Sequence, residues 1–219
     1  MTTWYRLLTA VLLLTGVALP AHSDEPTNDS TRQGTTVFGF YVGTTLSDFG
    51  DESTPQWVSR FGSVVGTYGV FYLTDLFALQ TDLSLDSKGG NIEERYDSDG
   101  LQINPAADIG LGYVEFAILA RLNQPISRYR DEYNFRPKLL LGFAIGTKVS
   151  TSARGIAGYL RPHFRDAELI LIFGGGFDQR VWGKRSLTID LRFGFGMSDV
   201  FADWNNSDAD ARFLVGFSL

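Results

Sequence analysis

The sequence predicts an all-β fold, an eight-stranded antiparallel up-and-down transmembrane β-barrel. Three observations predict it: an amino-terminal export signal, eight segments in which apolar and polar residues alternate, and connections that are short on one side and longer on the other. Successive side chains of a strand point to opposite faces, so alternation indicates a sheet with one apolar face. A chain of 219 residues suits one such domain.

The segment 186–198 shows the alternation most clearly. One face is apolar throughout and carries Leu187, Ile189, Leu191, Phe193, Phe195 and Met197. The other face is small or polar and carries Thr188, Asp190, Arg192, Gly194, Gly196 and Ser198. About 11 residues at roughly 3.3 Å each, tilted by about 45°, cover on the order of 25 Å. The segment is therefore long enough to cross a bilayer.

The chain begins with the features of a secretory signal peptide. Arg6 is the one charged residue among the first 23, an apolar run covers residues 7–19, and Ala21 and Ser23 are small residues suited to cleavage. The apolar run is shorter than the ~20 residues of a membrane-spanning helix. We expect a signal peptide over residues 1–23, a flexible periplasmic leader over 24–35 and an outer-membrane β-barrel over 36–219.

The first three expected strands cover residues 37–45, 61–72 and 77–87. In the first, the apolar face carries Phe38, Phe40 and Val42, and glycines lie opposite. In the second, one face carries Val64, Tyr68, Val70 and Tyr72. In the third, leucines alternate with the polar residues Gln80, Asp82, Ser84 and Asp86. Each pattern has the period of two that a half-buried strand requires.

The remaining strands are expected at 111–122, 138–148, 167–177, 186–198 and 211–219. In the fourth strand, Glu115, Ala117 and Arg121 oppose an apolar face, and in the fifth, small residues oppose leucine, phenylalanine and isoleucine. The sixth is apolar on both faces. The eighth places an apolar row at the carboxyl terminus, Phe213, Val215, Phe217 and Leu219, which suits the assembly signal of outer-membrane barrels.

The connections between these segments alternate in length. Thr74 and Asp75 form a tight turn, and residues 178–185 and 123–137 make the other connections on the same side. The opposite set is rich in Gly, Ser, Asp and Asn and covers residues 46–60, 88–109, 149–166 and 199–210. Membrane barrels have short periplasmic turns and longer outer loops. An even number of strands then returns both termini to the periplasmic side.

Alternation alone leaves open which face lies outside. A soluble exported barrel that binds an apolar ligand would show the same period with its apolar face inward. Charges of both signs on the polar face favour a closed lumen, because charges inside must be paired. These predicted lumen charges are Asp82, Glu115, Arg121, Lys138, Glu168, Asp190, Arg192 and Arg212. Most glycines of the strands share that face, where a narrow barrel needs small residues. We therefore predict that the apolar face meets lipid.

The predicted lumen charges carry a structural interpretation. Asp190 and Arg192 lie two residues apart on one face, and Arg212 is expected beside them across the last hairpin. We interpret the set as a salt-bridged plug that fills the lumen and fixes the strand register. An ion or proton path is the alternative, which eight strands disfavour because no continuous water column fits inside.

Several motifs, taken in order, resemble the PorT-like outer-membrane β-barrel family of Bacteroidetes-type bacteria. They are GFYVGTTLSDFG at 39–50, GTYGVFYLTDLFALQTDLSLDSKGG at 66–90, YVEFAILARL at 113–122, RPKLLLGFAIG at 136–146, LIFGGGFD at 171–178 and LTIDLRFGFGMSDVF at 187–201. The resemblance covers residues 36–219 and implies an eight-stranded barrel in the cell outer membrane without enzymatic activity. Such barrels commonly end on an aromatic residue, whereas this chain ends on Leu219.

The sequence offers little for catalysis or for cofactors. It has no cysteine, so thiol chemistry and disulfides are excluded. His163 is the one histidine after the signal peptide; it falls in a predicted outer loop with no nucleophile motif beside it. We therefore expect no catalytic residue, no metal site and no cofactor.

The expected partners are those of a membrane barrel. The net charge of −6 argues against nucleic acid. We expect contacts with outer-membrane lipids and the barrel-assembly machinery, and a protein partner at the long loops or the periplasmic turns. Aromatic residues near predicted strand ends are expected to form girdles at the membrane interfaces: Tyr41, Tyr68, Tyr72, Tyr113 and Trp182.

Overall fold

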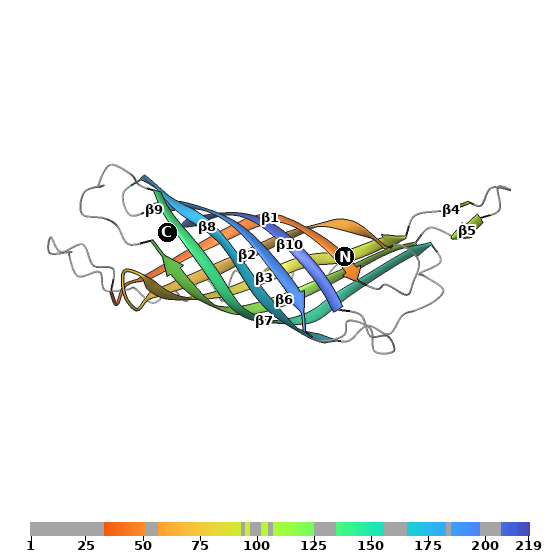
Figure 1. Cartoon of the computed structure of the whole chain (residues 1–219), viewed down its shortest axis with the longest axis horizontal. Helices are drawn as coiled ribbons and strands as arrows, with labels where there is room; N and C mark the ends of the chain where they lie inside the picture. The colour runs from red at the N-terminus through yellow and green to blue at the C-terminus, as the bar shows by residue number, and fades with distance from the viewer. Residues whose placement is uncertain are drawn as a thin grey trace, which may run out of the picture.

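Eight strands form a closed antiparallel barrel in the computed structural model, which describes residues 33–50, 57–92, 95–96, 102–104, 107–124, 135–155, 166–182, 185–197 and 207–219. The barrel strands are β1 (Thr36–Gly50), β2 (Trp57–Tyr72), β3 (Phe77–Ile92), β6 (Ala107–Asn123), β7 (Phe135–Gly155), β8 (Ala167–Trp182), β9 (Arg185–Gly196) and β10 (Ser207–Ser218). Each pairs with its neighbours in chain order, and the strands run obliquely to the long axis (Figure 1). The predicted eight-stranded up-and-down barrel is confirmed.

Two further short strands lie between β3 and β6 in the sequence. They are β4 (Arg95–Tyr96) and β5 (Gln102–Asn104), which pair with each other as a separate two-stranded sheet. The predicted signal peptide and most of the leader lie outside the described residues, as does His163. The described part of the chain contains no helix that is long and apolar enough to span a membrane.

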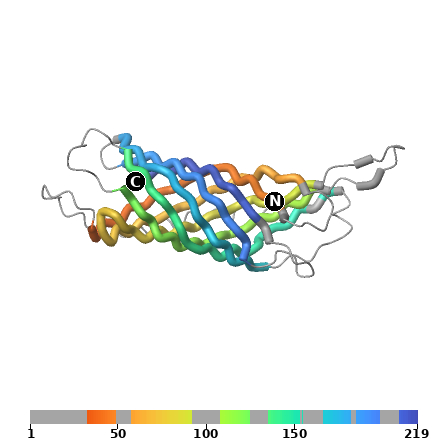
Figure 2. Tube along the Cα trace, in the orientation of Figure 1, coloured from red at the N-terminus to blue at the C-terminus, as the bar shows by residue number. Residues whose placement is uncertain are grey.

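The barrel closes by pairing its first strand with its last. The β1–β10 register runs from Gly39 opposite Ser218 to Gly50 opposite Ser207. The Leu219 amide donates a hydrogen bond of 2.8 Å to the Phe38 carbonyl at the end of this seam. Figure 2 shows the two strands side by side, β1 in orange and β10 in violet-blue. We call the end that contains Thr36 and Leu219 the termini end, and the opposite one the long-loop end.

The outer face of the barrel is apolar. On β9, the Leu191 side chain is 48% exposed, whereas Asp190 beside it is 1% exposed. The same contrast runs along the other strands, whose exposed large side chains include Phe38, Phe40, Val42, Phe116, Ile118, Leu139, Leu141, Phe143, Ile145, Phe173 and Phe213. The face assignment made from alternation is therefore correct for these strands. The alternative of an apolar ligand cavity inside the barrel is wrong, because charged groups occupy the interior.

Most strands are longer than the sequence predicts, chiefly at the long-loop end. β7 reaches Gly155, seven residues past the predicted limit at Lys148, and β3 reaches Ile92 rather than Ser87. Beyond the apolar band, outward residues such as Asn91 and Ser152 are polar. The backbone ladder continues although the alternation of polarity has ended, so hydropathy does not mark the true strand ends.

The β2–β3 pairing is interrupted near the long-loop end, between Ser59 and Val64. Arg60 fills this irregularity, since its Nη1 donates to the carbonyl oxygens of Lys88 and Ile109, each at 3.2 Å. The Ser47 hydroxyl from β1 donates to the Gly89 carbonyl at 2.9 Å and accepts from the Gly89 amide at 2.8 Å. Side chains therefore replace the missing ladder bonds at this bulge.

Substitution of Leu191 by arginine tests the orientation of the outer face. Leu191→Arg is expected to lower the free energy of unfolding of the vesicle-inserted protein by about 2–4 kcal/mol, because it places a charge in the middle of the hydrocarbon layer. Leu73→Arg is the control; Leu73 is also exposed but follows the end of β2, where an interfacial charge costs about 0–1 kcal/mol. Urea titration of vesicle-folded protein measures both. Equal effects of the two substitutions would contradict the assignment.

Candidate functional site

The barrel interior is the most charged part of the described molecule. Twelve acidic or basic side chains of the described residues, with relative exposures of 8% or less, point into it from β3, β6, β7, β8, β9 and β10. They are Asp82, Asp86, Lys88, Glu115, Arg121, Lys138, Glu168, Asp178, Asp190, Arg192, Asp210 and Arg212. Burial of so many charges is tolerable only when each finds partners. Their contacts divide them into two clusters along the barrel.

The termini-side cluster contains three cations and three carboxylates: Arg121, Lys138, Arg192, Asp82, Asp178 and Asp190. The Lys138 ammonium lies 2.9 Å from Asp178 Oδ1 and 2.7 Å from Asp190 Oδ1. Arg192 donates to Asp190 Oδ2 at 2.9 Å and also to Asp82. Arg121 donates to Asp178. The formal charges of this cluster cancel.

Neutral polar groups complete the termini-side cluster. The Thr188 hydroxyl donates to Asp178 at 2.7 Å, and the Gln80 amide donates to Asp82 at 2.9 Å. Arg121 Nε also donates to Asn123 at 2.7 Å. Arg121, Asp178 and Thr188 line a small open hollow at the termini end, together with Tyr68 and Tyr72. The cluster thus forms the floor of the opening nearest the termini.

The loop-side cluster contains two cations and four carboxylates: Lys88, Arg212, Asp86, Glu115, Glu168 and Asp210. The Lys88 ammonium contacts three of the carboxylates, at 2.9 Å from Glu115, 2.7 Å from Glu168 and 3.1 Å from Asp210.

Arg212 binds two carboxylates of the loop-side cluster through pairs of hydrogen bonds. Its bonds to Glu115 measure 2.6 and 3.2 Å, and those to Asp210 measure 2.7 and 2.9 Å. Such two-point contacts fix the orientation of the guanidinium plane. Arg212 therefore joins β6 to β10 across the lumen.

The sequence identified eight of the twelve interior charges as lumen residues. The structure places all eight inside, although Arg212 does not pair with Asp190. Arg192 and Arg212 lie directly opposite each other in the β9–β10 register, yet each turns to carboxylates of a different cluster. The four residues missed are Asp86, Lys88, Asp178 and Asp210. Lys88, Asp178 and Asp210 each lie one residue outside the predicted ends of their strands, so extending the period of two by one residue would have found them.

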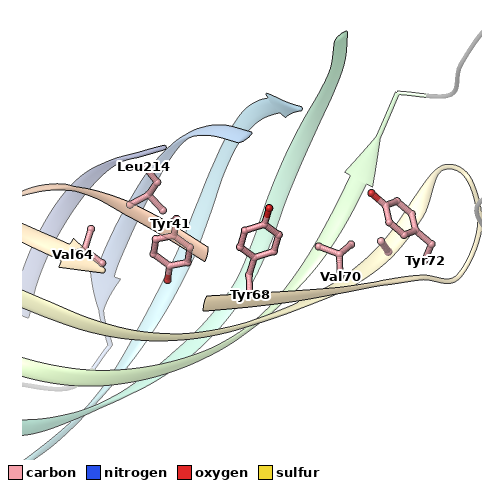
Figure 3. Packing of buried hydrophobic residues seen from close by; sticks show 7 residues of the cluster. Tyr41, Val64, Tyr68, Val70, Tyr72 and Leu214 are labelled. Atoms are coloured by element: carbon pink, nitrogen blue, oxygen red, sulfur yellow. The ribbon is translucent and has the colours of Figure 1, made fainter. Parts of the chain in front are cut away.

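The predicted tyrosine girdle is wrong. Tyr41, Tyr68, Tyr72 and Tyr113 are each 5% exposed or less. In Figure 3 the Tyr41, Tyr68 and Tyr72 rings project from β1 and β2 into the interior, in line with Val64 and Val70. The Trp182 side chain lies outside the described residues. Tyrosine suits this interior because its ring fills volume while its hydroxyl can find a hydrogen-bond partner.

The interior rings contact both charges and glycines. Arg192 lies over the Tyr41 ring at 5.5 Å, and Arg121 lies over the Tyr72 ring at 5.8 Å, both within cation–π range. Tyr41 and Tyr68 stack with their centroids 6.4 Å apart. Tyr41 also covers Gly66, where a Cβ would approach the ring to 2.6 Å. The glycines on the inner face therefore provide space for large neighbours.

The described residues contain no group of three or more His, Cys, Asp and Glu arranged to hold a metal ion. The carboxylates of both clusters are instead directed at lysine and arginine. The arrangement neutralises charge inside a closed barrel.

Comparison with known proteins identifies a family and a fold. Residues 27–202 match the model of the family described as outer membrane protein beta-barrel domain. The structure is similar to the outer membrane protein OprG from Pseudomonas aeruginosa, with 12% sequence identity, 85% of this chain and 96% of that chain covered, and a TM-score of 0.51. It is also similar to Neisserial surface protein A, with 10% identity, coverages of 83% and 96%, and a TM-score of 0.50. No curated protein matches this sequence.

Removal of one charge from the termini-side cluster tests whether its pairs depend on one another. Asp190→Leu is expected to lower the free energy of unfolding by about 3–5 kcal/mol, because it removes a carboxylate from both Lys138 and Arg192 inside the barrel. Combining it with Lys138→Met should recover much of this loss, since Arg192–Asp82 and Arg121–Asp178 then remain as balanced pairs. Urea unfolding of the two single variants and the double variant gives the coupling; strictly additive losses would contradict the account.

Proposed function

Because this chain belongs to the outer membrane protein beta-barrel domain family, we propose that it acts in the cell outer membrane as a closed barrel with a structural or partner-docking role and without enzymatic activity. The observation that carries the proposal is that buried ion pairs and tyrosine rings occupy the interior in both clusters. An interior filled in this way links strands on opposite sides of the barrel and leaves no path through which a solute could pass.

The dimensions of the barrel support a plugged lumen. An eight-stranded barrel has an interior just wide enough for side chains to fill. Arg192 reaches from β9 to Asp82 on β3, and Lys88 reaches from β3 to Glu168 on β8. Side chains that form ion pairs across the lumen leave no continuous column of water between the two ends.

The polar strand extensions at the long-loop end favour docking of a partner there. The strands continue past the apolar band there, and β7 presents exposed Ser152 and Arg154. Arg60 forms a 3.3 Å ion pair with Asp108, which braces β2 against β6. At the termini end, by contrast, only residues 73–76 separate β2 from β3. A polar rim stiffened by paired strands suits the recognition of a protein outside the cell.

We further propose partners for the wall itself. The outward apolar band fits the hydrocarbon of outer-membrane lipids. Phe213 of β10 and Leu219, which follows its end, are exposed on the outer face and offer the assembly machinery an apolar surface before the barrel closes. The ordered strand motifs support the finer assignment to the PorT-like group.

Planar-bilayer recording tests the plugged lumen. The purified, folded chain is expected to give no stepwise conductance, whereas a wide porin in the same bilayers should give one. Regular conductance steps from this chain would contradict the proposal, because they require a continuous aqueous path through the two clusters.

Photo-crosslinking in living cells tests the docking end. A crosslinking residue at Arg154 or Asn91 is expected to capture one discrete protein, because both positions lie on the strand extensions at the long-loop end. The matched positions at the termini end are Asp75 and Arg180. Adducts confined to these two would contradict docking at the long-loop end.

A further inference from the structure

The loop-side cluster has more negative than positive charge. Its ion pairs bring two cations, Lys88 and Arg212, to four carboxylates, whereas the termini-side cluster has three of each sign. All six groups of the loop-side cluster are at most 5% exposed. An uncompensated charge in such a place is expensive, and a carboxyl group there can avoid the cost by holding a proton.

The hydrogen bonds identify the carboxylate that is least well compensated. Arg212 directs paired hydrogen bonds to Glu115 and Asp210, and Lys88 contacts those two and Glu168. Asp86 has only a 3.4 Å approach from Arg212, and its Oδ2 accepts no hydrogen bond. Its Oδ1 accepts from the neutral hydroxyl of Thr45 at 2.8 Å.

We propose that Asp86 is a proton-binding site, which takes up a proton in the folded barrel in mildly acidic solution and releases it near neutral pH. The groups that face it are Thr45 from β1, Lys88 from its own strand, Glu115 from β6, and Asp210 and Arg212 from β10, with Glu168 of β8 on the far side of Lys88. A proton on Oδ2 reduces the negative excess without needing space, and the Lys88 ammonium already occupies the centre of the other three carboxylates.

The site makes the stability of the barrel depend on pH in a definite direction. An unfolded aspartate releases its proton near pH ~4. Between pH ~5 and neutrality the folded state then binds more protons than the unfolded state, so the free energy of unfolding rises as the pH falls. The paired carboxylates act in the opposite sense only below this window, where they become protonated in the unfolded chain.

Infrared spectroscopy of the full folded chain in lipid vesicles detects the proton directly. We expect a protonated-carboxyl stretching band at pH ~5 that weakens toward neutrality, shifts when the aspartates carry ¹³C in the side chain, and is absent from Asp86→Asn. The spectrum of the wild-type chain, with and without labelled aspartate, is sufficient to refute the proposal without any variant. Absence of the band, or a band that does not shift with labelled aspartate, would overturn it.

Urea unfolding between pH ~5 and neutrality provides the second measurement. Wild-type protein should show a higher urea midpoint at the acid end, and Asp86→Asn should flatten this dependence and raise the midpoint at neutral pH. Asp82→Asn is the matched control, since it lies on the same face of β3 but in the balanced cluster. It should lower the midpoint at both ends of the range. A pH dependence that is unchanged in Asp86→Asn would refute the site.

Discussion

The structure depends on the pairing of buried charges between strands that are far apart in the sequence. Arg192 and Asp82 are 110 residues apart, Arg212 and Glu115 are 97 apart, and Lys88 and Glu168 are 80 apart. Each charge is costly inside the barrel until its partner arrives. Closure of the sheet and neutralisation of the lumen must therefore occur together, and contacts of this separation are the slow ones to form.

Space inside the barrel imposes the second constraint. Glycine lies where a ring or a long side chain from a neighbouring strand packs over the inner face of the wall: Gly66 beneath Tyr41, and Gly174 beneath Arg192. A shift of one residue in any strand would exchange its two faces, moving charges into lipid and phenylalanines into the lumen. The side chains of the interior therefore also fix the register, and they support the proposal that the barrel is a wall with a polar rim rather than a channel.

The barrel could be predicted from the sequence because alternation survives wherever one face meets lipid, as in 186–198. Alternation does not distinguish the two faces where the inner face is apolar too. Tyr68, Val70 and Tyr72 alternate with outward residues as a lipid-facing row would, and only the closed barrel distinguishes them. The strand positions of Asp178 and Asp210 could not be predicted, because a polar strand extension and a polar loop look alike in composition. The partner of each charge depends on register and on distance across the lumen, which no local pattern contains.

Single-cysteine labelling is the most direct test of a barrel with lipid outside and paired charges inside, because the chain has no cysteine of its own. Spin labels would be placed at Leu187, Ile189 and Leu191 on the outer face, and at Thr188 and Leu214 on the inner face. The account predicts that outer labels relax with lipid-soluble oxygen and that inner labels are immobile and inaccessible to it. Oxygen access at the inner positions, with the outer ones shielded, would contradict it.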